Sequence, residues 1–240
     1  MSYSKSAPWY DVIYSFKDYA GEVDKLRAML EARARRPLRR VLDVACGTGE
    51  HLRFLQAFYD VEGLDLNEAM LEVARAKLPG VTLHHADMLD FDLGRGFDAV
   101  VCLFSAVGYL RTVEELTAGV ANMARHLEPG GVLAVEPWLT PDAFQSDTLH
   151  GLYVDRPEVK LARMTKSYVE GRVSVMDMHH LVNTARGVEY FVERHELTLF
   201  RPEEYAQAFQ AAGLESDVDA YGLIGRGLYL GRRPGGESAT

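Results

Sequence analysis

The segment Ala45-Cys46-Gly47-Thr48-Gly49 is the first place in the sequence where the backbone could come close to a ligand. It follows the apolar run from Arg40 to Ala45, which is typical of a strand covered on both faces, and a helical pattern comes after it. Glycine has no Cβ atom, so the chain at Gly47 and Gly49 can approach a ligand, and the first N–H groups of the next helix can bind an anion. The segment therefore predicts a turn that binds part of a cofactor.

Acidic residues stand at the ends of the next two apolar runs. Asp65 ends the run that begins at Asp60, about 20 positions after Asp43, an offset at which a carboxylate can accept hydrogen bonds from both hydroxyl groups of a ribose. Asp87 and Met88 follow the third run and offer an acceptor for an exocyclic amine beside an apolar surface for a purine. With the glycine turn, these residues predict an adenosine pocket, while we interpret Asp43 as structural, bonded to the backbone of the turn.

The elements that must position these residues alternate regularly between Lys17 and Glu136. Strand-like runs followed by helical patterns predict a mostly parallel, doubly wound sheet, in which ligands bind beyond the carboxyl ends of the strands. The expected strands are 40–45, 60–65, 81–85, 98–104 and 132–136, and the expected helices are 17–35, a helix after Gly49 with Leu52, Leu55 and Phe58 on its inner face, 67–78, and a helix opened by Thr112 and Glu115.

The sequence changes in character after Trp138. Three runs rich in β-branched and aromatic residues lie between Val159 and Phe200, which predicts an antiparallel meander that forms a lid. A further helix is expected from Pro202, and residues 214–232 are expected to form a hairpin that turns at Gly225-Arg226-Gly227. We therefore expect a main domain of residues 1–138 and 201–234, and a lid or substrate lobe of residues 139–200.

Composition and charge argue against several classes of protein. The 240 residues carry 26 basic and 35 acidic side chains, a formal charge of -9, which opposes the basic stripe of a nucleic-acid-binding surface. No stretch approaches the roughly 18 apolar residues of a membrane span, and residues 1–6 lack the apolar core of a signal peptide, so we expect a cytoplasmic protein. Cys46 and Cys102 lie in apolar runs and are expected to be reduced thiols. We expect no metal site, because residues 1–140 hold no Asp, Glu and His cluster at ligand spacing.

An adenosine pocket on such a sheet fits either NAD or a methyl donor. The dinucleotide fingerprint requires a third glycine three residues after Gly49, where this chain has Leu52. The segment Leu42-Asp-Val-Ala-Cys-Gly-Thr-Gly-Glu50 instead resembles the first motif of class I S-adenosylmethionine-dependent methyltransferases, and Asp65, Asp87 and Glu128-Pro-Gly-Gly131 extend the resemblance. This resemblance implies S-adenosylmethionine as the cofactor and an α/β fold: a doubly wound, mostly parallel, seven-stranded Rossmann-like sheet with the antiparallel β lid inserted after strand five.

A narrower resemblance extends over nearly the whole chain. It is carried by Tyr10-Asp11, Lys17-Asp-Tyr-Ala20, Asp87-Met88, Phe104-Ser105, Val107-Gly-Tyr-Leu110, Val135-Glu-Pro-Trp138, Leu197-Thr-Leu-Phe200 and Gly225-Arg-Gly-Leu228. These segments resemble the N,N-dimethyltransferases of TDP-linked amino deoxysugars, the desosamine and mycaminose type, in which a sugar amine attacks the methyl group of the cofactor twice.

The resemblance also implies roles for individual residues. With the glycine turn and Leu66, the expected cofactor contacts are Tyr10, Lys17, Ala45, Gly47, Gly49, Asp65, Leu66, Asp87, Met88 and Phe104. The residues expected near the sugar nucleotide are Tyr3, Tyr109, Trp138, Arg163, His179 and Arg226.

An amine acceptor must be neutral before it attacks, so a group that takes its proton is useful, while the main requirement is a lone pair held close to the methyl group in a dry site. The catalytic candidates are Tyr3, His179 and Glu136, with His195 as a second histidine of the lid. His179 and His180 are neighbours on an expected strand, so one faces inward and the other outward, and His179 is the candidate for a functional role. Glu136 is either a wall of the pocket or a charge partner for the amine.

Three alternatives stay open at this point. The chain is a methyltransferase for another small O- or N-acceptor, an NAD-dependent oxidoreductase, or a binding module without catalysis. The expected partner is a small-molecule substrate, for which the resemblance implies a TDP-amino sugar, and not a nucleic acid or a membrane. We expect a monomer or a homodimer, because a lid strand could pair with its counterpart in a second chain.

Overall fold

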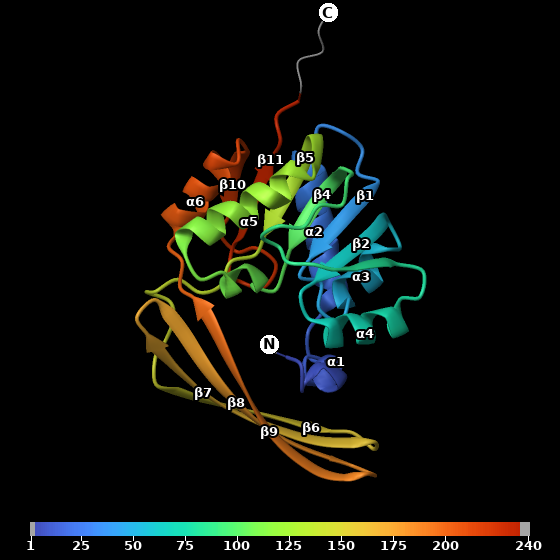
Figure 1. Ribbon diagram of the computed structural model, residues 1–240, viewed down its shortest axis with the longest axis vertical. Helices are drawn as coiled ribbons and strands as arrows, with labels where there is room; N and C mark the ends of the chain where they lie inside the picture. The colour runs from blue at the N-terminus through green and yellow to red at the C-terminus, as the bar shows by residue number, and fades with distance from the viewer. Residues whose placement is uncertain (1–2, 236–240) are drawn as a thin grey trace, which may run out of the picture.

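A computed structural model describes residues 3–235, and its central element is a seven-stranded sheet. In spatial order the strands are β10 (Glu215–Asp219), β11 (Leu228–Arg232), β5 (Leu127–Val135), β4 (Phe97–Cys102), β1 (Arg40–Val44), β2 (Asp60–Asp65) and β3 (Thr82–His85). Strands β1 to β5 pair in parallel, and β11 pairs antiparallel with both β5 and β10. The strand order reverses beside β1, which lies between β2 and β4, so the expected doubly wound sheet is confirmed (Figure 1).

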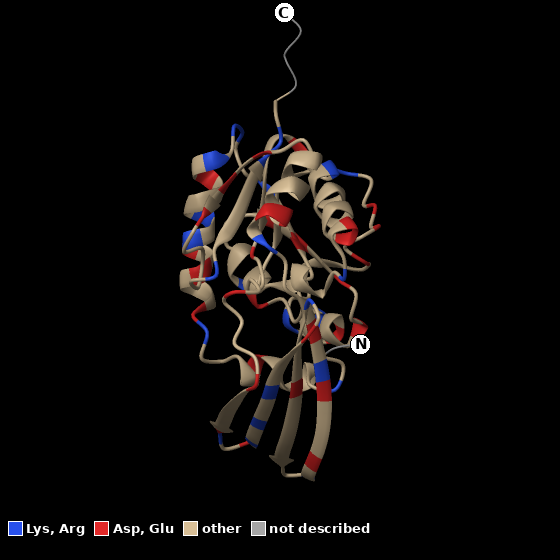
Figure 2. Ribbon diagram, turned by 90° about the vertical axis from the view of Figure 1, so that its left-hand side faces the viewer, with Lys and Arg blue, Asp and Glu red and all other residues tan. Residues whose placement is uncertain are grey.

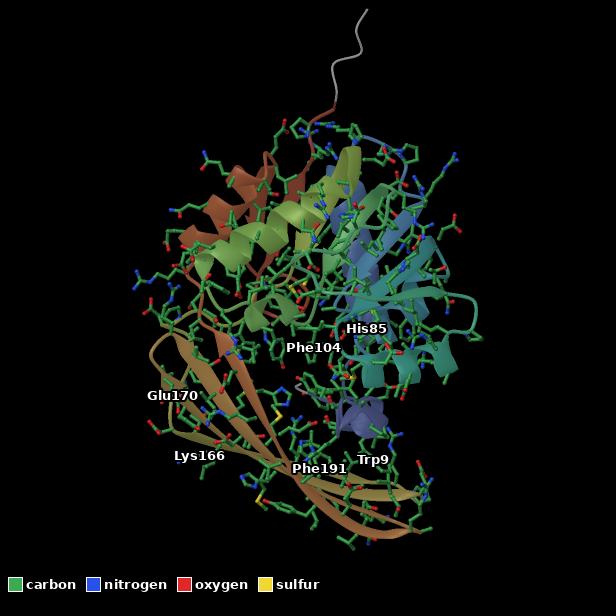
Figure 3. All side chains as sticks on the ribbon, viewed as in Figure 1. Trp9, His85, Phe104, Lys166, Glu170 and Phe191 are labelled. Carbon is green, nitrogen blue, oxygen red and sulfur yellow. The ribbon has the colours of Figure 1, made fainter. Side chains whose placement is uncertain are left out.

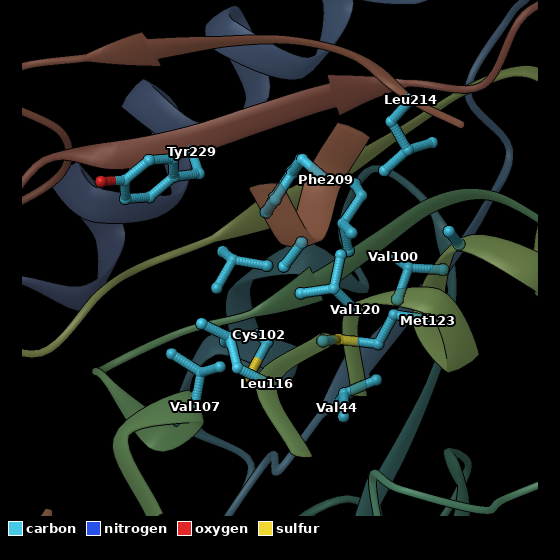
Figure 4. Packing of buried hydrophobic residues seen from close by; sticks show 14 of the residues in the cluster. Val44, Val100, Cys102, Val107, Leu116, Val120, Met123, Phe209, Leu214 and Tyr229 are labelled. Carbon is cyan, nitrogen blue, oxygen red and sulfur yellow. The ribbon is translucent and has the colours of Figure 1, made fainter. Parts of the chain in front are cut away.

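Helices cover both faces of this sheet. On one face lie α2 (Tyr19–Arg33), α3 (Glu50–Leu55) and α4 (Glu68–Lys77), and on the other lie α5 (Val113–Arg125) and α6 (Pro202–Ala211) (Figure 1). The apolar face of α5 packs Leu116, Val120 and Met123 against the sheet, as Figure 4 shows. Burial on both faces explains why β1, β4 and β5 are nearly continuous apolar runs in the sequence.

The lid is a separate antiparallel sheet inserted between β5 and α6. Its strands, in spatial order, are β6 (Thr148–Asp155), β7 (Val159–Glu170), β8 (Val173–Thr184) and β9 (Gly187–Thr198) (Figure 1). The three runs expected between Val159 and Phe200 are β7, β8 and β9, so the antiparallel lid is confirmed, and β6 is a fourth strand that was not predicted. Strand β6 was missed because it has apolar residues on both faces and a glycine at Gly151, so it shows no clear period of two.

The helix after the glycine turn is shorter than expected. It ends at Leu55, and Phe58 lies beyond it with 49% of its surface exposed, so the expected inward position of Phe58 was wrong. The guanidinium group of Arg27 covers its ring at 3.5 Å from the ring centroid. Leu52 and Leu55 do fill the core.

The amino-terminal segment joins the two sheets. It contains the short helices η1 (Ala7–Trp9) and α1 (Tyr10–Ile13), and Ile13 packs with Leu161 and Phe191 of the lid. A third short helix, η2 (Ala106–Tyr109), follows β4 on the side of the large sheet that faces the lid. The lid is therefore joined to the large sheet by the chain at its two ends, and it also packs against this amino-terminal segment (Figure 1).

The surface mixes both signs of charge. In the view of Figure 2, Lys and Arg segments alternate with Asp and Glu segments along the helices and the lid strands. No helix among residues 3–235 is long and apolar enough to cross a membrane.

Candidate active site

The glycine turn leaves β1 with backbone angles that favour glycine. Gly47 has φ +56° and Gly49 has φ +78°, and Gly49 caps the start of α3. A Cβ atom at Gly49 would lie 2.8 Å from Cδ1 of Leu78, whereas a Cβ atom at Gly47 would meet nothing within 4 Å. The open side of Gly47 therefore faces the space for a ligand, and Gly49 allows close packing behind it.

Asp65, at the end of β2, holds this turn in place. Its Oδ2 accepts a hydrogen bond of 2.8 Å from the N–H of Gly47, and its Oδ1 accepts one of 2.8 Å from the N–H of Asn67. Burial raises the pKa of Asp65, and the two N–H donors partly offset this effect. The structure thus brings Asp65 and the glycine turn together, although they are far apart in the sequence.

A cavity of about 410 Å³ opens at this point. It is lined by eight of the residues expected to contact the cofactor: Tyr10, Ala45, Gly47, Asp65, Leu66, Asp87, Met88 and Phe104. Two residues of that set lie elsewhere: Gly49 is packed against α4, and Lys17 lines a neighbouring cavity. The cavity spans the carboxyl ends of β1, β2 and β3, as the sheet topology requires.

Asp43 was read as a structural residue, and the structure gives it a different setting. Its side chain is 2% exposed and lines the 410 Å³ cavity, and among residues 3–235 no hydrogen-bond donor contacts its carboxylate. Burial raises the pKa of Asp43 to about 7. The sequence could not show this, because it does not reveal which carboxylates receive N–H donors. A buried carboxylate without a donor is suited to a positively charged ligand group.

A second cavity of about 770 Å³ lies between the large sheet and the inner face of the lid. It is lined by five of the six residues expected near the sugar nucleotide, namely Tyr3, Tyr109, Trp138, Arg163 and Arg226, whereas His179 does not line it. The two cavities share Tyr3, Phe104 and Tyr109. Phe104 lies at the edge of the large sheet that faces the lid (Figure 3).

Several cations line this second cavity, and each has a partner in the protein. The Nζ atom of Lys17 lies 2.7 Å from Glu22 and 4.1 Å from the ring centroid of Phe104. Arg226 donates a hydrogen bond of 3.0 Å to Oγ of Ser105, and its guanidinium group lies 4.9 Å from the ring of Trp138. These contacts hold the planar Arg226 side chain in a fixed direction.

Arg163 is held in a similar way from the lid. It donates a hydrogen bond of 3.1 Å to the hydroxyl of Tyr14. Arg163 lies on β7, and its guanidinium group is 5.3 Å from the ring centroid of Tyr14 in the amino-terminal segment.

Glu136 lies behind the junction of the cavities and lines neither of them. Its Oε2 accepts a hydrogen bond of 2.6 Å from the N–H of Phe104, whose φ is +51°. Burial raises the pKa of Glu136, while the charge of Arg226 opposes this rise. Glu136 is thus placed to hold the backbone of Phe104 rather than to contact a substrate.

The histidines of the lid are arranged differently from the expectation. His179 and His180 do lie on opposite faces, but His179 is on the outer face, where its Nδ1 is 2.7 Å from the hydroxyl of Tyr190. His179 therefore does not face the acceptor cavity. The sequence could not decide this, because an alternating pattern fixes which residues share a face and not which face is inside. His180 and His195 are the buried histidines, and His195 reaches Tyr109.

These features identify the class of the protein. A doubly wound sheet with an open glycine turn, an acidic residue at the end of β2 and a buried unpaired carboxylate fits S-adenosylmethionine, whose methionine part is positively charged. Leu52, which is fully buried, fills the position that a dinucleotide site leaves to glycine. The chain is a class I S-adenosylmethionine-dependent methyltransferase, and residues 41–131 match the family model described as "Methyltransferase domain".

Comparison with known proteins defines the family. The chain is 46% identical, over 92% of its length and 95% of the relative, to dTDP-3-amino-3,4,6-trideoxy-alpha-D-glucopyranose N,N-dimethyltransferase of Streptomyces venezuelae. It is 40% identical, over 98% of its length and 92% of the relative, to dTDP-3-amino-3,6-dideoxy-alpha-D-glucopyranose N,N-dimethyltransferase of Streptomyces fradiae.

Solved structures agree with these relatives. DesVI of Streptomyces venezuelae superimposes with a TM-score of 0.90 at 45% identity, covering 95% of this chain and 98% of that one. CalS10, an amino pentose methyltransferase from Micromonospora echinaspora solved with the methyl donor bound, gives a TM-score of 0.85 at 44% identity, covering 93% and 96%. The chain belongs to the family of N,N-dimethyltransferases of dTDP-linked amino sugars.

Proposed function

We propose that the enzyme transfers two methyl groups, one after the other, to the amine of a dTDP-linked amino deoxysugar. The observation that carries this proposal is the junction of two cavities at Tyr3, Phe104 and Tyr109. One cavity fits the methyl donor, and the other is large enough for a nucleotide sugar of ordinary ligand size. Its Arg side chains suit a pyrophosphate, and its aromatic rings suit a sugar or a base.

The donor cavity is proposed to hold S-adenosylmethionine through its polar residues. When bound, S-adenosylmethionine supplies a methyl group on a positively charged sulfur. Asp65 would accept hydrogen bonds from the ribose hydroxyls, and Asp87 with Met88 would contact the adenine ring. Asp43 would accept a hydrogen bond from the amino group of the methionine part.

The acceptor cavity is proposed to orient the sugar nucleotide. Arg163 and Arg226 would bind the pyrophosphate, with Trp138 beside them, and Tyr3 and Tyr109 would face the amine at the junction. Phe104 excludes water there, and a neutral amine held close to the methyl group in a dry site is the main requirement for transfer. Glu136 contributes by holding Phe104.

The test is methyl transfer from isotopically labelled S-adenosylmethionine to a panel of dTDP-3-amino and dTDP-4-amino deoxysugars. We expect products of one and then two added methyl groups, detected by mass spectrometry. Tight binding of S-adenosylhomocysteine without product from any of these sugars would remove the amino-sugar part of the proposal and keep the methyltransferase class. The matched control is the corresponding hydroxyl sugar, which has no amine.

We also propose that residues 139–200 act as a substrate lobe on a main unit of residues 1–138 and 201–234, that the enzyme works in the cytoplasm, and that two copies pair. Support for pairing comes from the outer face of the lid, where cross-strand neighbours Tyr153, Ala162, Leu181 and Tyr190 form an apolar row. Most of this row is exposed, which is unusual for large apolar side chains on one face of a sheet.

A further inference from the structure

A chain of hydrogen-bonding groups leads from the junction of the cavities into the lid. The hydroxyl of Tyr109, which lines both cavities, lies 2.8 Å from Nδ1 of His195. His195 is fully buried on β9 and lines neither cavity. The ring of Tyr3 lies 4.2 Å from the ring of His195, between centroids, and the Tyr3 hydroxyl also hydrogen-bonds to Tyr109.

A carboxylate stands on the far side of His195. Oε2 of Glu193 lies 3.8 Å from Nε2 of His195, a distance suited to attraction between charges. The other oxygen of Glu193 accepts hydrogen bonds of 2.9 Å from the N–H of Lys5 and 3.1 Å from the N–H of Ser6. Burial opposes the ionisation of Glu193, but its contacts with His195, Ser6 and Lys5 outweigh burial and lower its pKa to about 2. Glu193 is therefore charged at neutral pH.

We propose that Tyr109, His195 and Glu193 form the route by which the acceptor amine loses its proton. This inference rests on the proposed function. An aliphatic amine has a pKa of about 8 to 10 and is mostly protonated at neutral pH, so its lone pair is not free to attack. Tyr109 is the catalytic residue of this set, while His195 and Glu193 act through it.

The proposed transfer has two steps that balance. The amine N–H bond breaks and its proton binds the oxygen of Tyr109, while the Tyr109 O–H bond breaks and that proton binds Nδ1 of His195. The amine keeps its electron pair, Tyr109 stays neutral, and His195 becomes positively charged opposite Glu193. Imidazole is suited to this role because it changes charge near neutral pH. The arrangement follows the order of hydroxyl, imidazole and carboxylate known from nucleophilic triads, with a different task.

The other charged or titratable groups around His195 do not offer the same route. Tyr3 faces it from the amino-terminal segment, and His180 faces it from β8, with Arg163 paired beside His180 on β7. Burial lowers the pKa of His180 to about 4, so it resists taking a proton. Glu136 lines neither cavity. Tyr109 therefore joins the junction to the group best placed to receive the proton.

The test measures kcat and KM of Tyr109→Phe and His195→Gln between pH 6.5 and 10, with a dTDP-amino sugar that the wild-type enzyme accepts. We expect kcat to fall about 10²-fold at pH 7 with a smaller change in KM. The fall in kcat must become smaller as the pH rises past the pKa of the amine, because the amine then binds already deprotonated and no proton has to be removed. A loss that is the same at every pH would overturn the proposal and assign these residues a structural role.

Two further variants separate charge from packing. Glu193→Gln keeps an acceptor for the N–H groups of Lys5 and Ser6 but removes the charge opposite His195, so it should show a weaker form of the same pH-dependent loss. His180→Gln is the comparison variant on the same face: Nε2 of His180 also lies 3.9 Å from Oε2 of Glu193, but His180 has no hydrogen bond to Tyr109, so its variant should show no loss that depends on pH. The opposite ranking of these two variants would contradict the proposal.

A measurement without turnover completes the test. The ring protons of His195 are followed by NMR in the enzyme loaded with S-adenosylhomocysteine at pH 7, and the resonance is assigned with His195→Gln. Adding the amino sugar nucleotide should move this resonance part of the way toward the position of a charged imidazole, because the ammonium is the weaker acid and shares its proton only in part. The hydroxyl analogue, which has no ammonium proton to give, should not move it. Identical resonances in the two complexes would overturn the route. If no dTDP-amino sugar binds or reacts with the wild-type enzyme, the proposed function fails instead.

Discussion

At the scale of single residues, the two carboxylates Asp43 and Asp65 at the donor cavity differ because their surroundings differ. Asp65 receives two N–H donors and can brace the glycine turn, whereas Asp43 receives none among residues 3–235 and has its pKa raised to about 7. Asp65 and Asp87 were located from the sequence because ligands bind beyond the carboxyl ends of parallel strands. The sequence could not show that Asp43 lacks hydrogen-bond donors, or which of His179 and His180 faces inward, because both depend on tertiary contacts.

The raised pKa of Asp43 predicts how donor binding depends on pH. A protonated carboxyl cannot attract a cationic ligand, so affinity should be lost as the pH falls through about 7 and be fully present above it. We expect S-adenosylhomocysteine to bind about tenfold more weakly at pH 5.5 than at pH 7, as measured by calorimetric titration. The Asp43→Asn variant should bind S-adenosylhomocysteine weakly and with little dependence on pH. Any pH dependence that remains in this variant measures titration of the ligand itself. An equal change of affinity with pH in the wild-type enzyme and the variant would contradict the role of Asp43.

At the scale of elements, alternating strands and helices were enough to predict the large sheet and the place of the lid. Continuous apolar runs identify strands buried on both faces, and the caps at Asn67 and Thr112 mark two helix starts correctly. The pattern failed where elements depend on packing. Strand β6 carries apolar side chains on both faces, and α3 ends before Phe58, whose ring is covered by Arg27 rather than by the core.

The glycine turn offers a matched pair of substitutions. Gly47→Ala meets only the backbone strain of a positive φ, about 1 to 2 kcal/mol, whereas Gly49→Ala adds a contact of 2.8 Å with the buried Leu78 side chain. We expect Gly49→Ala to lower the free energy of unfolding by about 1 kcal/mol more than Gly47→Ala, measured by urea denaturation. Equal losses would show that Leu78 moves aside freely and that Gly49 is needed only for its backbone angles.

At the scale of the whole molecule, the lid has two faces with different surroundings. Its inner face closes the acceptor cavity and carries the buried His180 and His195, while its outer face exposes a row of apolar side chains. Folding alone does not explain such a row, because a solvent-facing side of an antiparallel sheet is usually polar.

The outer face predicts the oligomeric state. If two lids pack together, Leu181→Glu combined with Tyr190→Glu should turn a dimer into a monomer in sedimentation experiments, with the fold retained. Val218→Glu is the control, since Val218 is an exposed apolar residue on β10 of the large sheet. A wild-type enzyme that is monomeric at all concentrations would rule out this use of the lid.

The two ends of the described chain differ in how much they can be changed. Tyr3 lines both cavities and the N–H groups of Lys5 and Ser6 bond to Glu193, whereas β11 leads away to the side of the molecule opposite the lid (Figure 1). A purification handle or a linkage to a solid support therefore belongs at the carboxyl end. The same extension at the amino end would crowd the junction of the two cavities, which Tyr3 lines.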